Sequence, residues 1–199
     1  MSFGLINSDA HYAIGTREHM NQLRQLRATL SEDPERLRIL HLIRSLDLPD
    51  CWAAAGFVRS AIWDKQHNRT HSPLPPDIDV IWFDETRADS AVDTEIETDL
   101  LRLDSSLNWS VKNQARMHSR NNDRPYESAT DSMMSWPETA TAVAVRLGMD
   151  DVLEVAAPFG LDDLFNLVVR PTARFEMEKS RFTLTGSDQK TGSPLGLIF

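Results

Sequence analysis

The sequence predicts a single α/β domain. Short runs of β-branched and aromatic residues, typical of strands, alternate along the chain with longer segments in which apolar residues recur every three or four positions. The chain has 199 residues, a length typical of one compact domain. Hydrophobic residues make up 41% of the chain, which is enough to form a sizeable core.

The N-terminal part predicts two helices. Residues 16–30 carry apolar side chains at helical spacing, whereas residues 1–15 are expected to be a flexible extension. Ser31 is predicted to cap the second helix, and Pro34 fits its first turn. That helix, which is expected to pack on the sheet, should end near Pro49.

A strand, a glycine turn and a helix are predicted next. Residues 51–56 are apolar and end in Gly56, and residues 57–67 again have helical spacing. After a proline-rich loop, the run 77–83 alternates and is rich in β-branched and aromatic residues, so it predicts another strand.

The second half of the chain continues the alternation up to residue 180, the expected end of the domain. Residues 181–199 are expected to form a weakly structured tail. The predicted elements are a helix over 87–103, a strand over 109–113 with a helical turn through 118, strands over 139–147 and 152–156 joined by a hairpin turn, and a helix over 160–167.

Asp77 and Asp79 open the strand 77–83 and are the most informative residues of the chain. Because side chains alternate across a strand, both carboxylates are predicted to lie on one face. Two adjacent carboxylates repel each other unless a cation lies between them, and Mg²⁺ prefers oxygen ligands. The alternative is an ordinary solvent-facing edge with two unpaired acids.

Upstream of this pair, the turn at Gly56 has the features of a phosphate site. A glycine allows close approach of a phosphate to the backbone, and the following helix start supplies free N–H groups and partial positive charge. Arg59, in the first turn, can donate a bidentate hydrogen bond to phosphate. A phosphate turn beside a carboxylate metal site is the arrangement that phosphoryl or nucleotidyl transfer requires.

These residues resemble the head signature of the DNA polymerase β nucleotidyltransferase superfamily. Residues 56–64 and 77–80 look most like the Gly-Gly-x-Val-Arg-Asp and Asp-x-Asp motifs of tRNA nucleotidyltransferases. Three further blocks resemble a family of small stand-alone bacterial nucleotidyltransferases of unestablished substrate, and the resemblance extends over residues 37–171. The blocks are 109–118, 136–143 and 157–165.

The resemblance implies a fold, a cofactor and a substrate. The fold would be a small mixed twisted sheet with helices packed mainly on one face. Asp77 and Asp79 would be the catalytic metal ligands for Mg²⁺ or Mn²⁺, and the substrate would be a nucleoside triphosphate. Lys112, Asn113 and Arg116 are expected to reach its phosphates or base, although an ordinary polar surface loop remains the alternative.

The sequence departs from the superfamily pattern at two positions. Phe57, which we include in the phosphate-binding turn, stands where a second small residue is usual. Asn113 stands where many members have a third carboxylate, and we expect it to lie close to the acid pair. If another acid completes the cluster instead, the candidates are Asp104, Asp162 and Asp163.

Composition limits the partners and the compartment. The net charge of −9 argues against a long nucleic-acid substrate, because non-specific affinity depends on Lys and Arg. The single cysteine, Cys51, excludes an internal disulfide and is expected to be a buried thiol in a cytoplasmic protein. Apolar runs are too short to span a bilayer. His67 and His71 lack the further ligands of a zinc site.

The predicted function is a Mg²⁺-dependent nucleotidyltransferase that transfers a nucleoside monophosphate to an unknown acceptor. A small molecule or a protein side chain fits the acidic chain better than a long nucleic acid. The alternative is a catalytically weak or inactive nucleotide-binding module of the same fold, which would use Asn113 in place of a third acid. An enzyme of the tRNA nucleotidyltransferase kind would require a basic tRNA-binding domain, which is not evident here.

Overall fold

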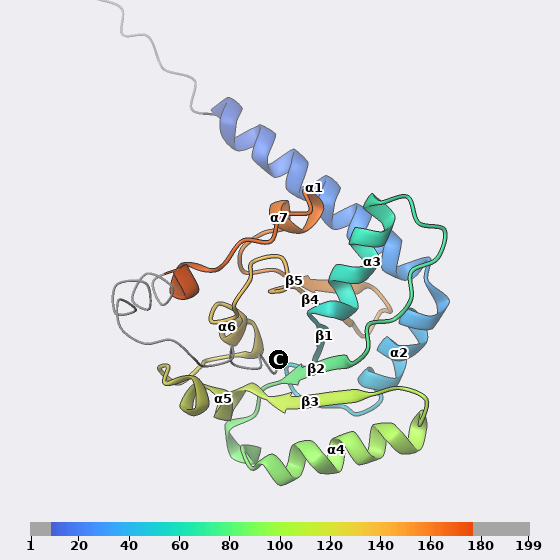
Figure 1. Cartoon of the computed structure of the whole chain (residues 1–199), viewed down its shortest axis with the longest axis vertical. Coiled ribbons are helices and arrows are strands. Elements are labelled where there is room, and N and C mark those ends of the chain that lie inside the picture. Colours follow the sequence, from blue (N-terminus) through green and yellow to red (C-terminus); the bar gives the residue numbers. More distant parts are fainter. Residues whose placement is uncertain (1–8, 177–199) are drawn as a thin grey trace, which may run out of the picture.

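A computed structural model describes residues 9–176, with side chains from residue 17 onward (Figure 1). Its helices are α1 (Asp9–Ser31), α2 (Pro34–Arg44), α3 (Gly56–Gln66), the 3₁₀ helix η1 (Glu85–Arg87), α4 (Ser90–Leu103), α5 (Gln114–Asn121), α6 (Ala129–Met133) and α7 (Asp162–Phe165). Its strands are β1 (Trp52–Ala54), β2 (Ile78–Trp82), β3 (Trp109–Asn113), β4 (Ala144–Leu147) and β5 (Leu153–Ala156).

The strands form one mixed sheet in the order β3-β2-β1-β4-β5. Only β2 and β3 are parallel to each other, and the helix α4 connects them as a crossover. The pairs β1–β2, β1–β4 and β4–β5 are antiparallel. Figure 1 shows α4 running alongside the edge strand β3, so this edge is covered rather than left open.

The two faces of the sheet are packed differently. One face carries Ile78, Val80 and Val111 and buries them against apolar residues of α1, α2, α3 and α4. The opposite face carries Trp52 and Ile81 and packs against the short helix α6. The expected α/β fold, with a mixed sheet covered mainly on one side, is therefore confirmed.

Several boundaries differ from the sequence-based expectation. Helix α1 begins at Asp9, which is earlier than residue 16, where the sequence pattern starts the first helix. Asp33, and not Ser31, caps α2, because its carboxylate accepts the N–H groups of Glu35 and Arg36. The predicted tail, residues 181–199, lies outside the described residues.

The region between α5 and β5 was the least well predicted. The sequence pattern did not reveal α6, whose five residues are too few to show a helical period. The run 139–147 alternates Ala and Val, but only residues 144–147 form a strand, since residues before them turn. The hairpin to β5 and the strand β3 were predicted correctly.

Candidate functional site

The acid pair lies at the start of β2. Asp79 is only 8% exposed, and Asp77 is half-buried directly before the strand. The pKa of Asp79 is raised to about 6, first by burial and second by the nearby charge of Asp77, whereas a hydrogen bond from the Ser110 side chain and the charge of Lys112 oppose the rise. The structure therefore brings the two carboxylates together.

The register of β2 and β3 decides what surrounds Asp79. Asp79 pairs with Ser110 and Ile81 pairs with Lys112 in a parallel ladder, so these four side chains share one face. All four line a pocket on that face. The pocket has about 830 Å³ of empty space, counting the part that is open to solvent.

The walls of the pocket come from segments that follow β3. Helix α5 contributes Met117 and Arg120, and the connections around α6 contribute Tyr126 and Trp136. Phe175, far along the chain, closes another side. In the sequence, Trp136 falls within a block that resembles the family, whereas Arg120, Tyr126 and Phe175 stand in no local pattern that signals a pocket.

Asn113 does not lie beside the acid pair, contrary to the sequence-based prediction. It pairs with Trp82, on the face of the sheet opposite Asp79, and it is completely buried. Its Oδ1 accepts the N–H of Ala115 at 3.0 Å and so caps α5. Its Nδ2 donates to the carbonyls of Asp84 and Arg87 at 2.8 and 2.9 Å, so its role is structural.

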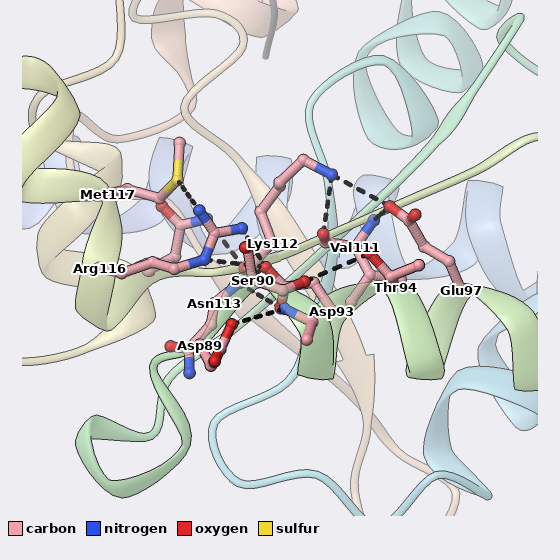
Figure 2. Close-up of polar contacts among 12 residues, drawn as sticks. Asp89, Ser90, Asp93, Thr94, Glu97, Val111, Lys112, Asn113, Arg116 and Met117 are labelled. Carbon is pink, nitrogen blue, oxygen red and sulfur yellow. Dashed lines mark hydrogen bonds and ion pairs between the residues drawn. The ribbon is translucent and has the colours of Figure 1, made fainter.

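Arg116 is likewise held away from the pocket. Its guanidinium forms an ion pair with Asp93 of α4, which is 2% exposed, and the Nε–Oδ2 distance is 3.1 Å. The same carboxylate accepts Trp82 Nε1 and the backbone N–H of Asn113, each at 2.9 Å. Figure 2 shows the contacts that join Asp93 to Asn113 and Arg116. Arg116 therefore joins helices α4 and α5 and does not line the pocket.

Lys112 is the one residue of the predicted polar group 112, 113 and 116 that lines the pocket. Its ammonium donates to Glu97 Oε1 at 3.0 Å and to the carbonyl of Val111 at 2.8 Å, as Figure 2 shows. The Glu97 carboxylate also accepts the N–H of Val111 at 2.8 Å, which satisfies a donor of the edge strand. Lys112 is thus oriented along the edge of the pocket.

The turn before α3 is shaped by local packing and backbone conformation. Phe57 is fully buried in the main hydrophobic core. Ala55 takes the unusual backbone angle, with a φ of 52°. A Cβ on Gly56 would lie 3.2 Å from the Cβ of Pro75, so close approach of Pro75 alone already favours glycine there.

Arg59 and the start of α3 lie at the edge of this region. Helix α3 has no side-chain cap at its start. The Arg59 guanidinium lies 3.4 Å from Glu138 Oε2 and packs over Trp63, with one third of its side chain exposed. A pairing this long and this exposed leaves Arg59 able to turn toward an anion.

The other acids considered at the sequence level are engaged elsewhere. Asp104 pairs with Arg38 at 2.7 Å, and Asp163 pairs with Arg170 at 2.8 Å. Asp162 accepts the amide of Gln22 at 2.8 Å. Within residues 9–176, no three His, Cys, Asp or Glu side chains gather as a metal site.

Cys51 is buried, as predicted. Burial raises the pKa of its thiol to about 12, so the thiolate is scarce at neutral pH. None of the helices in the described part of the chain is long and apolar enough to cross a membrane.

Comparison with known proteins bears on the family and the fold. A family model described as nucleotidyltransferase matches residues 41–191. A solved NMR structure described as revealing a CCA-adding enzyme head domain is 35% identical, with a TM-score of 0.70 over 82% of this chain and 86% of that chain.

A tRNA-processing enzyme in an apo form is 15% identical over 72% of this chain and 39% of that chain, and its TM-score of 0.46 is too low to bear on function. No curated protein matches the chain significantly. The family model nevertheless covers most of the sequence, including the acid pair and the pocket residues of β2, β3 and α5. The chain therefore belongs to the nucleotidyltransferase family.

Proposed function

We propose that this protein is a divalent-metal-dependent nucleotidyltransferase that transfers a nucleoside monophosphate from a nucleoside triphosphate to an acceptor other than a long nucleic acid. The observation that carries the proposal is the position of Asp77 and Asp79. They form a close carboxylate pair at the start of β2, and Asp79 lines the pocket. Such a pair is an unfavourable arrangement without a cation, and membership of the family supplies the reaction class.

Asp77 and Asp79 fit Mg²⁺ or Mn²⁺ as ligands. Both supply hard oxygen donors, and their mutual repulsion, which contributes to the raised pKa of Asp79, would be relieved by a cation. Mg²⁺ sites in nucleotide enzymes commonly use one or two carboxylates and complete the coordination with water and substrate phosphates. When bound, the ion would neutralise charge on the triphosphate.

The turn at Gly56 and the uncapped start of α3 are proposed to bind the outer phosphates. The N–H groups at a helix start that lack a side-chain cap can donate hydrogen bonds to an anion, and the helix dipole favours negative charge there. Arg59 would exchange its long contact with Glu138 for a charged hydrogen bond to phosphate. A glycine at position 56 would then be needed for two reasons, because it allows Pro75 to pack closely and allows a phosphate to approach the backbone.

In the proposed reaction, an acceptor hydroxyl oxygen forms a bond to the α-phosphorus. The bond from that phosphorus to the oxygen bridging the α- and β-phosphates breaks, pyrophosphate leaves, and the hydroxyl proton passes to solvent. The Ser110 side chain forms a hydrogen bond with the Asp79 carboxylate and so holds it in place. Lys112 adds positive charge on the same face of the sheet.

A second candidate function is nucleotide binding without catalysis. The specific observation that favours it is that no third acid joins Asp77 and Asp79 in residues 9–176. The neighbouring position on β3, which faces Asp79, is occupied by Ser110. Pyrophosphate release separates the two functions, because a binding module would hold the nucleotide and leave it intact.

The test combines metal titration with a turnover assay. Mn²⁺ binding, followed by electron paramagnetic resonance, should be seen for the wild type and lost in the double variant Asp77→Asn/Asp79→Asn. The exposed substitution Asp99→Asn is the control for a change of net charge. Equal Mn²⁺ binding by the wild type and the double variant would contradict the proposal.

The turnover assay measures pyrophosphate release from each of the four nucleoside triphosphates with Mg²⁺. A signal that disappears in the double variant supports transfer. Binding of a nucleotide without any release, even in the presence of a broad set of hydroxyl compounds, would favour the binding module instead.

A further inference from the structure

The pocket beside Asp79 is larger than the acid pair and the phosphate turn need. It extends from Asp79 along the sheet face past Lys112 and is lined on its other sides by residues as distant in sequence as Tyr126 and Phe175. Neither Gly56 nor Arg59 lines it, so the proposed phosphate site and the pocket are separate regions that meet at Asp79.

The strand register shows on which side of Asp79 each region lies. Strand β1 is antiparallel to β2 and Ala54 pairs with Asp79, so Gly56 follows toward the N-terminal end of β2. Ile81, Lys112 and Gln114, which line the pocket, follow toward the C-terminal ends of β2 and β3. The pocket and the phosphate turn therefore extend from Asp79 in opposite directions along the sheet.

This arrangement matters for the direction of attack. In phosphoryl transfer, the attacking and leaving oxygens lie roughly in line on opposite sides of the phosphorus. If pyrophosphate leaves on the side of Gly56, the acceptor oxygen must arrive from the opposite side, which is the side of the pocket. The pocket is therefore placed to hold the acceptor.

The walls indicate the shape of the molecule that would fit. Tyr126, Trp136 and Phe175 come from three separate segments and line one pocket with aromatic residues, and Met117 adds an adaptable side chain. The Tyr126 hydroxyl donates a hydrogen bond to the Asp123 carboxylate and accepts one from the Asn121 amide, so the Tyr126 side chain is held in place. A ligand with a flat apolar ring would bury more of its surface among these side chains than a purely polar ligand would.

The charges indicate a second feature. Arg120 lines the pocket and makes no hydrogen bond or ion pair with any other residue in the range 9–176. Lys112 and Arg174 also line it, although both have carboxylate partners in Glu97 and Asp123. A pocket guanidinium that has no partner among the described residues favours an anionic ligand.

We propose that this pocket binds the acceptor, and that the acceptor is a small anion with a flat ring and a hydroxyl group. The inference rests on the proposed nucleotidyl transfer and names its second substrate. The acceptor hydroxyl is presented to the α-phosphorus at Asp79, the ring lies among the aromatic residues, and the anionic group meets Arg120.

The test uses 4-hydroxybenzoate as the probe and its uncharged analogue 4-hydroxybenzamide as the comparison. In protein labelled with ¹³C at methionine methyl groups, 4-hydroxybenzoate should shift the Met117 signal, assigned with Met117→Leu. Met149, which is fully exposed on the β4–β5 turn, serves as the internal control and should not shift. The amide should bind about tenfold more weakly, because it lacks the charged hydrogen bond.

Arg120→Ala should weaken binding of 4-hydroxybenzoate by about tenfold and leave the affinity for the amide unchanged. Arg102→Ala, which removes an exposed guanidinium on α4, is the matched control and should change neither affinity. Absence of any shift at Met117, or equal binding of acid and amide, would overturn the assignment of the acceptor class.

A final arm tests which substrate occupies the pocket. With Mg²⁺ and the α,β-methylene analogue of each nucleoside triphosphate, which cannot release pyrophosphate, 4-hydroxybenzoate should stay bound. Displacement by the analogue would make the pocket the nucleobase site and overturn the proposal. The probe arms need neither nucleotide nor metal, so their failure leaves nucleotidyl transfer standing, whereas failure of the nucleotides to bind would contradict the proposed function itself.

Discussion

At the scale of single residues, Asp79 combines burial with a charged neighbour, which lowers stability and favours a cation. Its pKa is raised from an ordinary 3.8 to about 6, first by burial and then by Asp77. Between these two pH values the folded protein holds a proton that the unfolded chain has lost. Ionisation of Asp79 therefore lowers the free energy of unfolding as the pH rises through this window.

This sign gives a prediction for Asp79→Asn. The variant should be more stable than the wild type above pH 6, by at most about 3 kcal/mol, because a shift of one pKa unit corresponds to about 1.4 kcal/mol. Near pH 4 the difference should vanish. Urea denaturation at pH 4 and pH 7.5 measures both values, and Asp99→Asn is the control for an exposed aspartate.

The same substitution should abolish Mn²⁺ binding, so a gain of stability would accompany a loss of function. An Asp79→Asn variant that is less stable than the wild type at pH 7.5 would contradict this account. It would show that the ionised carboxylate makes net favourable contacts without a cation.

At the scale of elements, the register between β2 and β3 decides which side chain faces the acid pair. Ser110 lies opposite Asp79 on the same face, and Asn113 lies on the other face. The substitution Ser110→Asp should therefore tighten Mn²⁺ binding, because a third negative charge would face the cation. Isothermal titration with Mn²⁺ measures the change.

Asn113→Asp is the matched comparison for this prediction. It should leave the affinity for Mn²⁺ unchanged and destabilise the protein, because a carboxylate cannot donate to the carbonyls of Asp84 and Arg87. Tighter Mn²⁺ binding by Asn113→Asp than by Ser110→Asp would mean that the register is wrong.

The contacts of Asp93 tie the ends of β2 and β3 to α5. Asp93→Ala would leave Trp82 Nε1, the Asn113 N–H and the Arg116 guanidinium without their acceptor, so we expect a loss of about 3–5 kcal/mol in the free energy of unfolding. Arg116→Ala should cost less stability, because part of this guanidinium is exposed. Urea denaturation tests both values.

Nucleotide affinity separates the two possible roles of Arg116. If Arg116 only joins helices, Arg116→Ala should lower the stability and leave triphosphate affinity within about twofold of the wild type. A large loss of nucleotide affinity at unchanged stability would restore the sequence-based interpretation of Arg116 as a ligand-binding residue.

At the scale of the whole molecule, the net charge of −9 bears on the partner. Non-specific nucleic-acid binding gains its free energy from counterions that Lys and Arg displace. We therefore expect a single-stranded RNA of about 20 nucleotides to bind more weakly than about 10 μM at 0.15 M salt. Fluorescence anisotropy measures this affinity, and a repeat at 0.02 M salt controls for purely electrostatic attraction.

Sub-micromolar binding that falls steeply with salt would contradict this expectation. It would show that a local basic surface outweighs the overall charge and would favour an RNA acceptor, despite the acidic chain.

The sequence by itself determined the alternation of helices and strands and the place of the acid pair. Strand periodicity is local, so the common face of Asp77 and Asp79 and the strand 109–113 followed from the order of residues alone. The helix behind Gly56 also followed from spacing. These features carry the family resemblance and the metal hypothesis.

Only the tertiary structure decided which residues complete the site. The parity of Asn113 with Trp109 was readable, but the face that those residues share depends on hydrogen-bond register with β2, which no local pattern specifies. Arg116 was drawn away by Asp93, a partner 23 positions earlier. Tyr126 and Phe175 are far apart in the sequence but line the same pocket. Packing between distant segments brings them together, and such packing leaves no pattern in the sequence.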